Sequence, residues 1–265
     1  MPGVTVILIT LNESANIGAA LESARWADEI VVVDAESTDD TVAIARRYTD
    51  RVIVRPWPGY IAQKNFAAAQ ASHDWVFSLD ADERVTPELA AEIKALLSAG
   101  PSCAGYRGPR VSRYLGRWIR STDWYPDRQL RLYDRRRAAW TGRYVHESVR
   151  VEGAVGALRG SLEHHPYRDV SHHLQTIDRY STLAARQMFE DDRRTGAVGI
   201  LIHAGAAFLR NYVLRGGFRD GAAGLILSLL NSYYVAAKFV KLWELCSPST
   251  STPPDPGEGD RTRSS

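Results

Sequence analysis

Short apolar runs alternate with amphipathic segments along the first hundred residues. Four runs rich in β-branched and aromatic residues cover positions 4–10, 29–33, 51–55 and 75–79. A continuous apolar run of this length indicates a strand that is covered on both faces, as the strands of a parallel sheet are. The repeated alternation predicts an α/β domain whose parallel strands are joined by right-handed helical crossovers.

Helix signals separate these strands. We predict helices at residues 12–26, 37–48, 60–71 and 86–100. The start of the last one is marked most clearly, because Thr86 can cap the first turn, Pro87 takes the first helical position and Glu88 adds an early acid.

The pattern changes after residue 100. Strand-like runs without clear helices between them lie at residues 103–109, 129–134, 144–151 and 155–162. They predict a mixed, partly antiparallel continuation of the same sheet. Further along, we predict a helix at residues 172–191, apolar helices at 199–214 and 222–245, and a disordered Pro/Ser/Gly-rich tail at 247–265.

The run at residues 75–79 ends in Asp80-Ala81-Asp82-Glu83. A buried strand delivers its last residues to the carboxyl edge of the sheet, where open α/β sheets bind their ligands. Two carboxylates this close repel each other unless a positive group lies between them, and Mg²⁺ or Mn²⁺ prefers carboxylates combined with phosphate oxygens. The segment therefore predicts a cation site for a phosphate-bearing substrate. An acidic turn that merely ends the strand is the alternative.

The composition is that of a folded protein, with 45% hydrophobic and 24% charged residues and a net charge of +2. The charge is uneven, because an arginine-rich middle, residues 107–137, follows the acidic first hundred. Such a patch could meet the phosphates of a nucleotide, a lipid head group or a nucleic acid. Cys103 and Cys246 lack the spacing of a zinc site or a disulfide framework.

Four motifs follow one another in the first hundred residues: VTVILITLNES (4–14), VVVDAESTDDT (31–41), QKNFAAAQ (63–70) and FSLDADE (77–83). Together they resemble the family 2 inverting glycosyltransferases, which have the GT-A fold. The later segments WYPDRQLRLYDRR (124–136), YVHESV (144–149) and KLWEL (241–245) resemble the bacterial lipopolysaccharide-core β-glucosyltransferase-like subgroup.

The resemblance implies a Rossmann-like mixed sheet flanked by helices, with an apolar helical extension at its C-terminal end. The catalytic domain would cover residues 1–165, divided into a nucleotide-sugar-binding half (1–100) and an acceptor-side half (101–165). The helical extension would cover residues 166–246, ahead of the tail at 247–265.

The resemblance also implies a reaction, in which a hexose passes from a nucleotide-sugar, with a UDP-sugar favoured, to a saccharide or lipid-linked acceptor of the cell envelope. A divalent cation, Mg²⁺ or Mn²⁺, would bind at Asp82 and Asp80 and offset the charge of the departing diphosphate. The implied substrate-binding residues are Asn12 and Glu13 (nucleoside), Asp34 (base or ribose), Lys64 and Asn65 (base or phosphates), Asp80 (ribose) and Arg131 (phosphate or acceptor). Many relatives have two adjacent acids where this chain has Asp34-Ala35-Glu36.

Inversion requires a base that takes the proton of the acceptor hydroxyl on the face opposite the diphosphate. The candidates beyond the acidic turn are Glu147 and Asp127. Glu147 follows a predicted strand at residues 143–145 and resembles the acidic position of a motif found elsewhere in the superfamily, so we favour it. A salt-bridged surface carboxylate is the alternative for both.

Aromatic and histidine residues of the middle region have less specific interpretations. Trp124 and Tyr125 could stack on a sugar ring, although burial in the core is the commoner fate of such residues. His164-His165 and His172-His173 lack partners at metal-ligand spacing. We therefore expect polar loops there rather than a metal site.

Residues 221–245 approach the length of a membrane-spanning helix, but they include Asn231, with Lys238 and Lys241 near the end. Residues 199–214 are similarly apolar. Either these helices pack on the catalytic domain, or they lie in a membrane interface, which aromatic and basic residues favour. We prefer a cytoplasmic protein attached peripherally to the inner face of the cytoplasmic membrane over a true span.

Two other functions compete with this prediction. A nucleotidyltransferase would want a glycine-rich phosphate loop after the first strand, and LNESANIG (11–18) is not one. A nucleic-acid-binding protein built on the arginine-rich middle would carry a recognisable binding motif, which the sequence lacks. We therefore expect a nucleotide-sugar donor, a glycan acceptor and a membrane surface as partners, and no nucleic acid.

Overall fold

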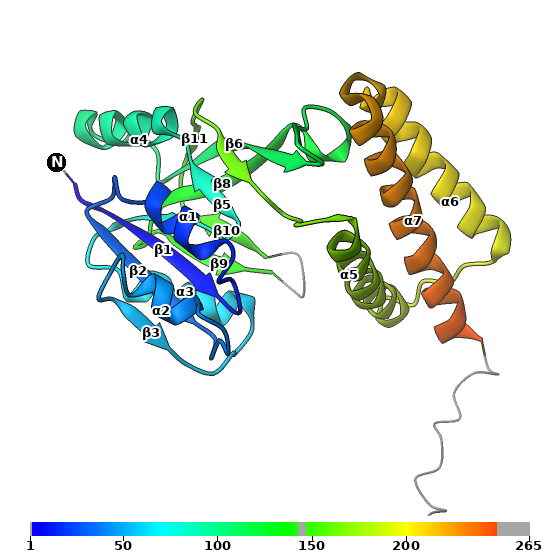
Figure 1. Ribbon diagram of the computed structural model, residues 1–265, viewed down its shortest axis with the longest axis horizontal. Helices are drawn as coiled ribbons and strands as arrows, with labels where there is room; N and C mark the ends of the chain where they lie inside the picture. The colour runs from blue at the N-terminus through cyan, green and yellow to red at the C-terminus, as the bar shows by residue number, and fades with distance from the viewer. Residues whose placement is uncertain (1, 143–146, 248–265) are drawn as a thin grey trace, which may run out of the picture.

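The computed structural model describes residues 2–142 and 147–247. Its main element is a ten-stranded mixed sheet with the order β3-β2-β1-β4-β8-β6-β12-β5, to which β7 and β11 add by pairing with β6 (Figure 1). The strands are β1 (Val4–Thr10), β2 (Glu29–Asp34), β3 (Val52–Val54), β4 (Trp75–Ser78), β5 (Glu83–Val85), β6 (Gly105–Tyr114), β7 (Arg117–Trp118), β8 (Asp127–Asp134), β9 (Ala138–Thr141), β10 (Ser148–Val151), β11 (Val155–Ala157) and β12 (Leu162–His164). Strands β9 and β10 form a separate antiparallel pair.

The helices flank this sheet and extend beyond it. They are α1 (Ile17–Ser23), α2 (Thr41–Ala45), α3 (Tyr60–Ala69), α4 (Pro87–Ala99), α5 (Val170–Glu190), α6 (Ala197–Leu209) and α7 (Gly221–Cys246), with short turns η1 (Thr122–Trp124), η2 (Arg210–Leu214) and η3 (Gly217–Asp220). The predicted α/β class, with a mixed sheet flanked by helices and an apolar helical extension, is confirmed.

The first four strands are parallel, as predicted. Strand β1 pairs in parallel with β2 and β4, and β2 pairs in parallel with β3. Helix α4 begins as expected, with Thr86 Oγ1 accepting a hydrogen bond from the Leu89 amide and Pro87 at the first position. Helix α1 begins at Ile17 instead of residue 12, because Asn12 has a φ of 54° and the segment after it forms turns.

The second half of the sheet is mixed, as predicted, but its strands are divided differently. The predicted strand at 155–162 is two strands, β11 and β12, which pair in parallel with opposite ends of β6. Between them Gly160 lies against the backbone of Leu89, where a Cβ atom would come within 2.5 Å of the Leu89 Cα. Strands β5, β7 and β9 are additional to the prediction. Of the predicted strand at 144–151, residues 144–146 lie outside the described residues.

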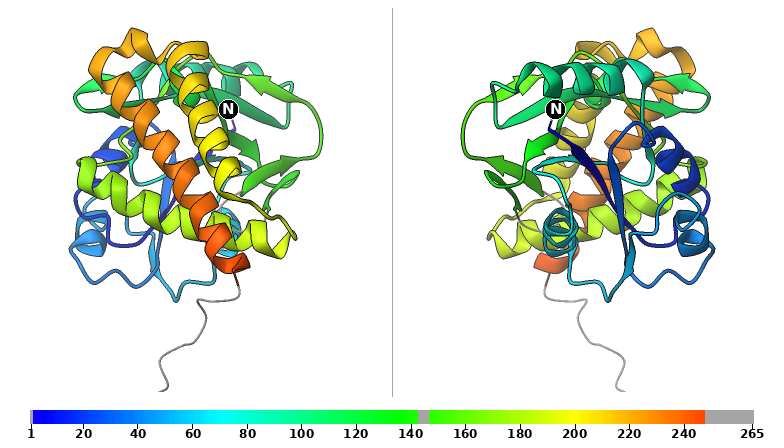
Figure 2. Two further views of the ribbon diagram at one scale, coloured as in Figure 1. Left: turned by 90° about the vertical axis from the view of Figure 1, so that its right-hand side faces the viewer. Right: turned by 90° about the vertical axis from the view of Figure 1, so that its left-hand side faces the viewer.

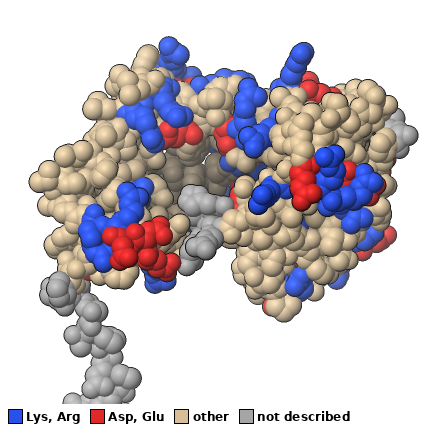
Figure 3. Space-filling view, turned by 180° about the vertical axis from the view of Figure 1, so that it is seen from behind, with Lys and Arg blue, Asp and Glu red and all other residues tan. Residues whose placement is uncertain are grey.

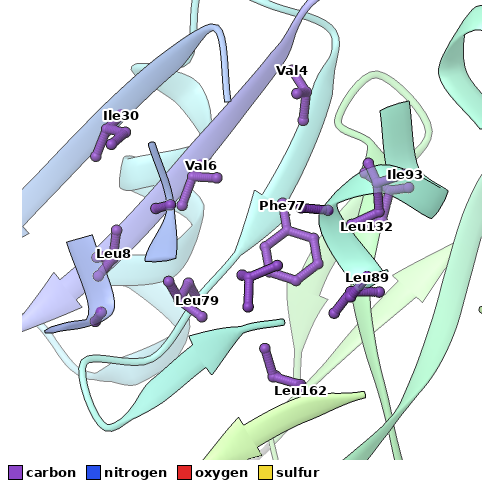
Figure 4. Packing of buried hydrophobic residues seen from close by; sticks show 14 of the residues in the cluster. Val4, Val6, Leu8, Ile30, Phe77, Leu79, Leu89, Ile93, Leu132 and Leu162 are labelled. Carbon is purple, nitrogen blue, oxygen red and sulfur yellow. The ribbon is translucent and has the colours of Figure 1, made fainter. Parts of the chain in front are cut away.

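The two faces of the sheet are buried under different helices. Alternate residues of a strand point to opposite faces, so Val6 and Leu8 of β1 pack with Phe77 and with Leu89 and Ile93 of α4 (Figure 4). On the other face, Ile7 packs with Val31, Val33 and the alanines of α3. Because both faces are covered, the functional groups of the strands are left at their carboxyl ends.

Helices α5, α6 and α7 lie together beside the sheet, and α5 crosses α7 (Figure 2). Ala185 and Met188 of α5 pack with Phe239 and Leu242 of α7. Beyond these contacts, much of the apolar surface of α6 and α7 is exposed, as at Leu201, which is 74% exposed. Two segments, Ala197–Leu214 and Gly217–Cys246, are long and apolar enough to cross a membrane by length and composition alone.

Candidate functional site

A cleft of about 530 Å³ lies between the carboxyl ends of β1 and β4 and helix α5. We call it the strand-end cleft; its lining includes Thr10, Glu13, Trp57, Tyr60, Lys64, Asp80, Asp82, Glu147, His164, Arg179 and Tyr180. The space-filling view shows a hollow between the sheet and the helical part of the molecule (Figure 3). The prediction that ligand-binding groups gather at the strand ends agrees with this position.

The acidic segment forms a tight turn between β4 and β5. The Asp80 amide donates to Glu83 Oε2 (3.1 Å), and the Glu83 amide donates to the Asp80 carbonyl (3.0 Å). The Glu83 side chain is fully buried, whereas the side chains of Asp80 and Asp82 are 29% and 30% exposed. The turn therefore presents two carboxylates to the cleft and keeps the third beneath them.

Asp80 is neutralised by two buried cations. Lys64 Nζ lies 3.1 Å from Asp80 Oδ1, and an Arg131 Nη atom lies 2.5 Å from Asp80 Oδ2. Burial favours the protonated carboxyl, but the charges of Arg131 and Lys64 outweigh it and hold the pKa of Asp80 well below its usual range. Asp80 is thus ionised and largely committed to protein partners.

These ion pairs continue beneath the turn. Arg131 also pairs with Glu83 (2.5 Å), Arg110 pairs with Glu83 (3.0 Å), and Arg110 pairs with Asp127 (2.6 Å). The result is a charge chain of alternating sign, formed by Lys64, Asp80, Arg131, Glu83, Arg110 and Asp127. Because each buried charge has an opposite neighbour, the chain fixes the acidic turn at a defined position.

Asp82 differs from Asp80, because its side-chain partner among the described residues is the imidazole of His164 and not a pair of cations. Asp82 Oδ2 lies 3.3 Å from His164 Nε2, and His164 Nδ1 lies 2.8 Å from Ser112 Oγ. If Nδ1–H donates to Ser112, Nε2 keeps a lone pair directed toward Asp82. In the described part of the chain, no group of three or more His, Cys, Asp or Glu side chains is arranged to hold a metal alone.

This donor set fits a cation that is shared with a substrate. A carboxylate and an imidazole are both ligands of Mn²⁺, and Mg²⁺ or Mn²⁺ commonly completes its coordination with phosphate oxygens and water. The sequence predicted polar loops at His164-His165 and His172-His173, and this was wrong for three of the four: His164 ends β12, and His172 and His173 lie in α5. The place of His164 beside Asp82 depends on β12 pairing with both β5 and β6, which the spacing of residues along the sequence does not reveal.

Asn12 and Asp34 hold the first two strand ends together. Asp34 is fully buried and accepts hydrogen bonds from the Ser37 amide (2.7 Å) and hydroxyl (2.6 Å). Asn12 Oδ1 accepts from the Thr38 amide (2.8 Å). Glu13 lines the cleft. Burial raises the pKa of its carboxyl, and a hydrogen bond from Asn16 offsets only part of this effect. Of these three predicted nucleoside contacts, Glu13 lines the strand-end cleft.

Asn65 and Asp127 are not among the residues that line the strand-end cleft. Asn65 exchanges two hydrogen bonds with the backbone of Trp140, whose ring lies 4.2 Å from Lys64 Nζ. Both carboxylate oxygens of Asp127 are engaged, one by Arg110 and the other by Gln129 Nε2 at 2.6 Å. These two predicted site residues therefore support the walls of the site.

Glu147 does line the cleft, and its Oε2 is buried without a hydrogen-bond partner among the described residues. The strand predicted just before it, at residues 143–145, lies outside those residues. Trp57 and Tyr60 also line the cleft and form an edge-to-face pair with 4.8 Å between ring centres, and Arg179 and Tyr180 enter from α5. The sequence signalled none of these four, because loops and a distant helix bring them to the site.

Comparison with known proteins agrees with the geometry. The family described as Glycosyl transferase family 2 matches residues 5–165. The chain is 34% identical to the lipopolysaccharide core biosynthesis glycosyltransferase LpsC of Rhizobium meliloti, over 91% of this chain and 92% of that protein. It is 29% identical to an uncharacterized glycosyltransferase of Rickettsia prowazekii, over 92% of this chain and 87% of that protein.

Among solved structures, the chain is similar to glucosyl-3-phosphoglycerate synthase from Mycobacterium tuberculosis in complex with Mg²⁺ and uridine diphosphate. The identity is 26% and the TM-score 0.37, and the match covers 41% of this chain and 44% of that chain, less than half of either. The family match spans the whole mixed sheet, and the Rhizobium relative extends the likeness over the C-terminal helices. The chain belongs to glycosyltransferase family 2 and is a transferase.

Proposed function

We propose that this transferase moves a hexose from a nucleotide-sugar to a saccharide of the cell envelope, with inversion at the anomeric carbon. The observation that carries the proposal is the inequality of the two cleft carboxylates. Asp80 is bound by Lys64 and Arg131, whereas Asp82 faces the cleft beside His164. Such an arrangement suits one cation held between Asp82, His164 and a diphosphate.

The residues of the cleft have separate roles in this proposal. Asp82 and His164 would hold Mg²⁺ or Mn²⁺, which when bound would offset the charge of the departing diphosphate. Asp80, fixed by the charge chain, would accept a hydrogen bond from the ribose. Lys64 lies between Asp80 and the ring of Trp140, where its charge would favour a bound phosphate.

We favour Glu147 over Asp127 as the base. The proton of the acceptor hydroxyl must pass to a carboxylate that lies in the cleft and is free to accept it. Glu147 has a buried oxygen with no partner among the described residues, whereas both oxygens of Asp127 are engaged. Arg131 would act indirectly, by positioning Asp80 and Glu83.

The acceptor would be lipid-linked and reached at a membrane surface. The exposed apolar side chains of α6 and α7 suit an interface between water and lipid, and Arg210, Arg215 and Arg219 lie near the junction of the two helices. The similarity to a lipopolysaccharide core glycosyltransferase supports an acceptor in that class. We expect no nucleic-acid affinity, because Arg110 and Arg131 of the arginine-rich middle are committed to the charge chain.

Calorimetry with a panel of nucleotides (UDP, GDP, ADP, CMP and dTDP), with and without Mn²⁺, tests the donor site. We expect one diphosphate to bind with micromolar affinity only when the metal is present, and Asp82→Ala to abolish this binding. Asp50→Ala removes an exposed carboxylate just ahead of β3, at the end of that strand opposite the carboxyl edge that forms the cleft; it is the control and should bind as the wild type does. A folded wild-type protein that binds none of these nucleotides would refute the proposal.

A further inference from the structure

A second cavity adjoins the strand-end cleft on the side of the helices. It has a volume of about 230 Å³ and lies between α5 and α7, with Trp124 and Tyr167 closing one side. Tyr180 of α5 lines both this cavity and the strand-end cleft. A molecule in the cavity would therefore lie next to one in the cleft, on the side away from β4.

The lining combines flat aromatic rings with a few polar groups and three aliphatic side chains, Ile177, Leu227 and Leu230. We call this space the aromatic cavity; its aromatic and polar lining includes Trp124, Tyr167, Tyr180, Tyr234, Thr176 and Asn231. A sugar ring presents apolar C–H faces as well as hydroxyls, so aromatic faces together with sparse hydrogen-bonding groups match it. An acyl chain would need no polar partner in such a cavity.

The aromatic wall is held in place from behind. Tyr167 stacks on His173 with 4.0 Å between ring centres, and His173 Nδ1 lies 2.9 Å from the Tyr114 hydroxyl. Tyr114 also contacts Trp124 edge to face at 5.4 Å. The rings are thus anchored to the end of β6, and a ligand would meet a preformed surface.

Asn231 gives a second indication of a polar ligand. It lies on the cavity side of α7, and its amide nitrogen is buried without an acceptor among the described residues. An unpaired buried donor is costly, and an acceptor brought by a ligand would remove that cost. The volume is below the roughly 300–1,000 Å³ of sites for drug-sized ligands, so one ring fits better than an extended chain.

We propose that the aromatic cavity is an acceptor subsite that holds one sugar ring of the acceptor saccharide while a neighbouring sugar hydroxyl reaches the strand-end cleft. This inference rests on the proposed transferase function. Because the cavity is separate from the acidic turn, its contribution should be to acceptor binding, with no effect on the affinity for the nucleotide.

Paired variants of α7 test the subsite. Asn231→Leu keeps the side-chain size but removes the amide, and Tyr234→Leu removes an aromatic face. Tyr233→Leu is the matched control, because Tyr233 is the preceding residue and is 55% exposed. The acceptor is the water-soluble oligosaccharide released by mild acid from the envelope of cells that lack this protein. The donor is the nucleotide-sugar identified by calorimetry, supplied with Mn²⁺.

We expect Asn231→Leu and Tyr234→Leu to raise the acceptor KM at least tenfold, with kcat changed much less and the nucleotide Kd and the thermal midpoint unchanged. Tyr233→Leu should leave all four quantities unchanged. An acceptor KM that stays at the wild-type value in both cavity variants would overturn the subsite while leaving the transferase function intact. Absence of nucleotide binding in the wild type would instead refute the transferase function itself.

Discussion

On the sheet side of the strand-end cleft, charged groups hold one another in place, whereas on the helical side aromatic rings are held by packing. Asp80 is fixed by Lys64 and Arg131, and these ions continue into the charge chain. Tyr167 and Trp124 are instead fixed through Tyr114 and His173. The difference matches the two substrates that we propose, because a diphosphate is recognised by charge and a neutral sugar by shape and sparse hydrogen bonds.

The largest effect should come from Glu147, the base that we propose. Replacing Glu147 by Gln keeps the shape but removes the proton acceptor, so we expect kcat to fall by roughly 10²- to 10⁴-fold. The nucleotide affinity measured by calorimetry should be unchanged, because Glu147 is not part of the charge chain. The matched variant Asp127→Asn tests the other candidate, and a larger loss of kcat there than in Glu147→Gln would reverse our assignment.

The next effect concerns the stability of the charged side. Arg131→Met leaves the fully buried Glu83 with Arg110 as its remaining cation, and removing one partner of a buried ion pair costs about 3–5 kcal/mol. Chemical denaturation should show this loss in the free energy of unfolding. Arg25→Met is the control, because Arg25 pairs with Glu22 on the surface and both side chains are more than half exposed, and it should change little. Equal stability of both variants would mean that the charge chain does not hold the turn.

The third effect concerns membrane attachment, for which we expect the exposed leucine side chains of α6 to be needed. Leu201→Asp introduces a charge into the exposed surface of α6. A leucine side chain that becomes buried in the membrane contributes about 1.5–3 kcal/mol to binding, so its loss should weaken partition into vesicles about tenfold or more. Sedimentation with vesicles of phosphatidylethanolamine and phosphatidylglycerol measures this. Val155→Asp, at an exposed position of β11, should bind as the wild type does. Unchanged partition of Leu201→Asp would argue against α6 as the lipid-facing surface.

The smallest effect is a pH dependence of the packed aromatic wall. Burial, with a smaller contribution from His172, lowers the pKa of His173 to about 4, so the ring is neutral in the folded protein. The unfolded chain takes up this proton near pH 6.5, so the stabilisation is complete above about pH 6.5 and is lost as the pH falls toward 4. The free energy of unfolding, measured at pH values between 4 and 7.5, should depend less steeply on pH in His173→Gln than in the wild type. Identical slopes would show that His173 carries no such linkage.

The sequence predicted the charged side far better than the aromatic side, and the reason is geometric. Parallel strands deliver their last residues to a common edge, so the apolar runs alone brought Asp80, Asp82 and Glu13 to one cleft. His164 was placed in a polar loop by the sequence, because its position beside Asp82 depends on β12 pairing with strands from two other parts of the chain. The hydrophobic periodicity of one segment does not indicate which distant strands that segment will pair with.

Side-chain roles were harder to predict than positions. Asn65 lies on the expected helix, yet its amide bonds the backbone of Trp140, which belongs to a strand 75 residues further on. Tyr180 comes from a helix that the sequence predicted correctly without any sign of the face that meets the cleft. These contacts follow from the tertiary packing of α5 and β9.

The most direct test of the donor site is whether His164 and the nucleotide share one metal ion. Pulsed electron paramagnetic resonance on the protein with Mn²⁺ and the bound nucleotide diphosphate detects ¹⁴N coupling from an imidazole ligand and ³¹P coupling from the phosphates. We predict both couplings in the wild type and selective loss of the ¹⁴N coupling in His164→Gln. A spectrum without ¹⁴N coupling in the wild type, or one that His164→Gln leaves unchanged, would contradict the account.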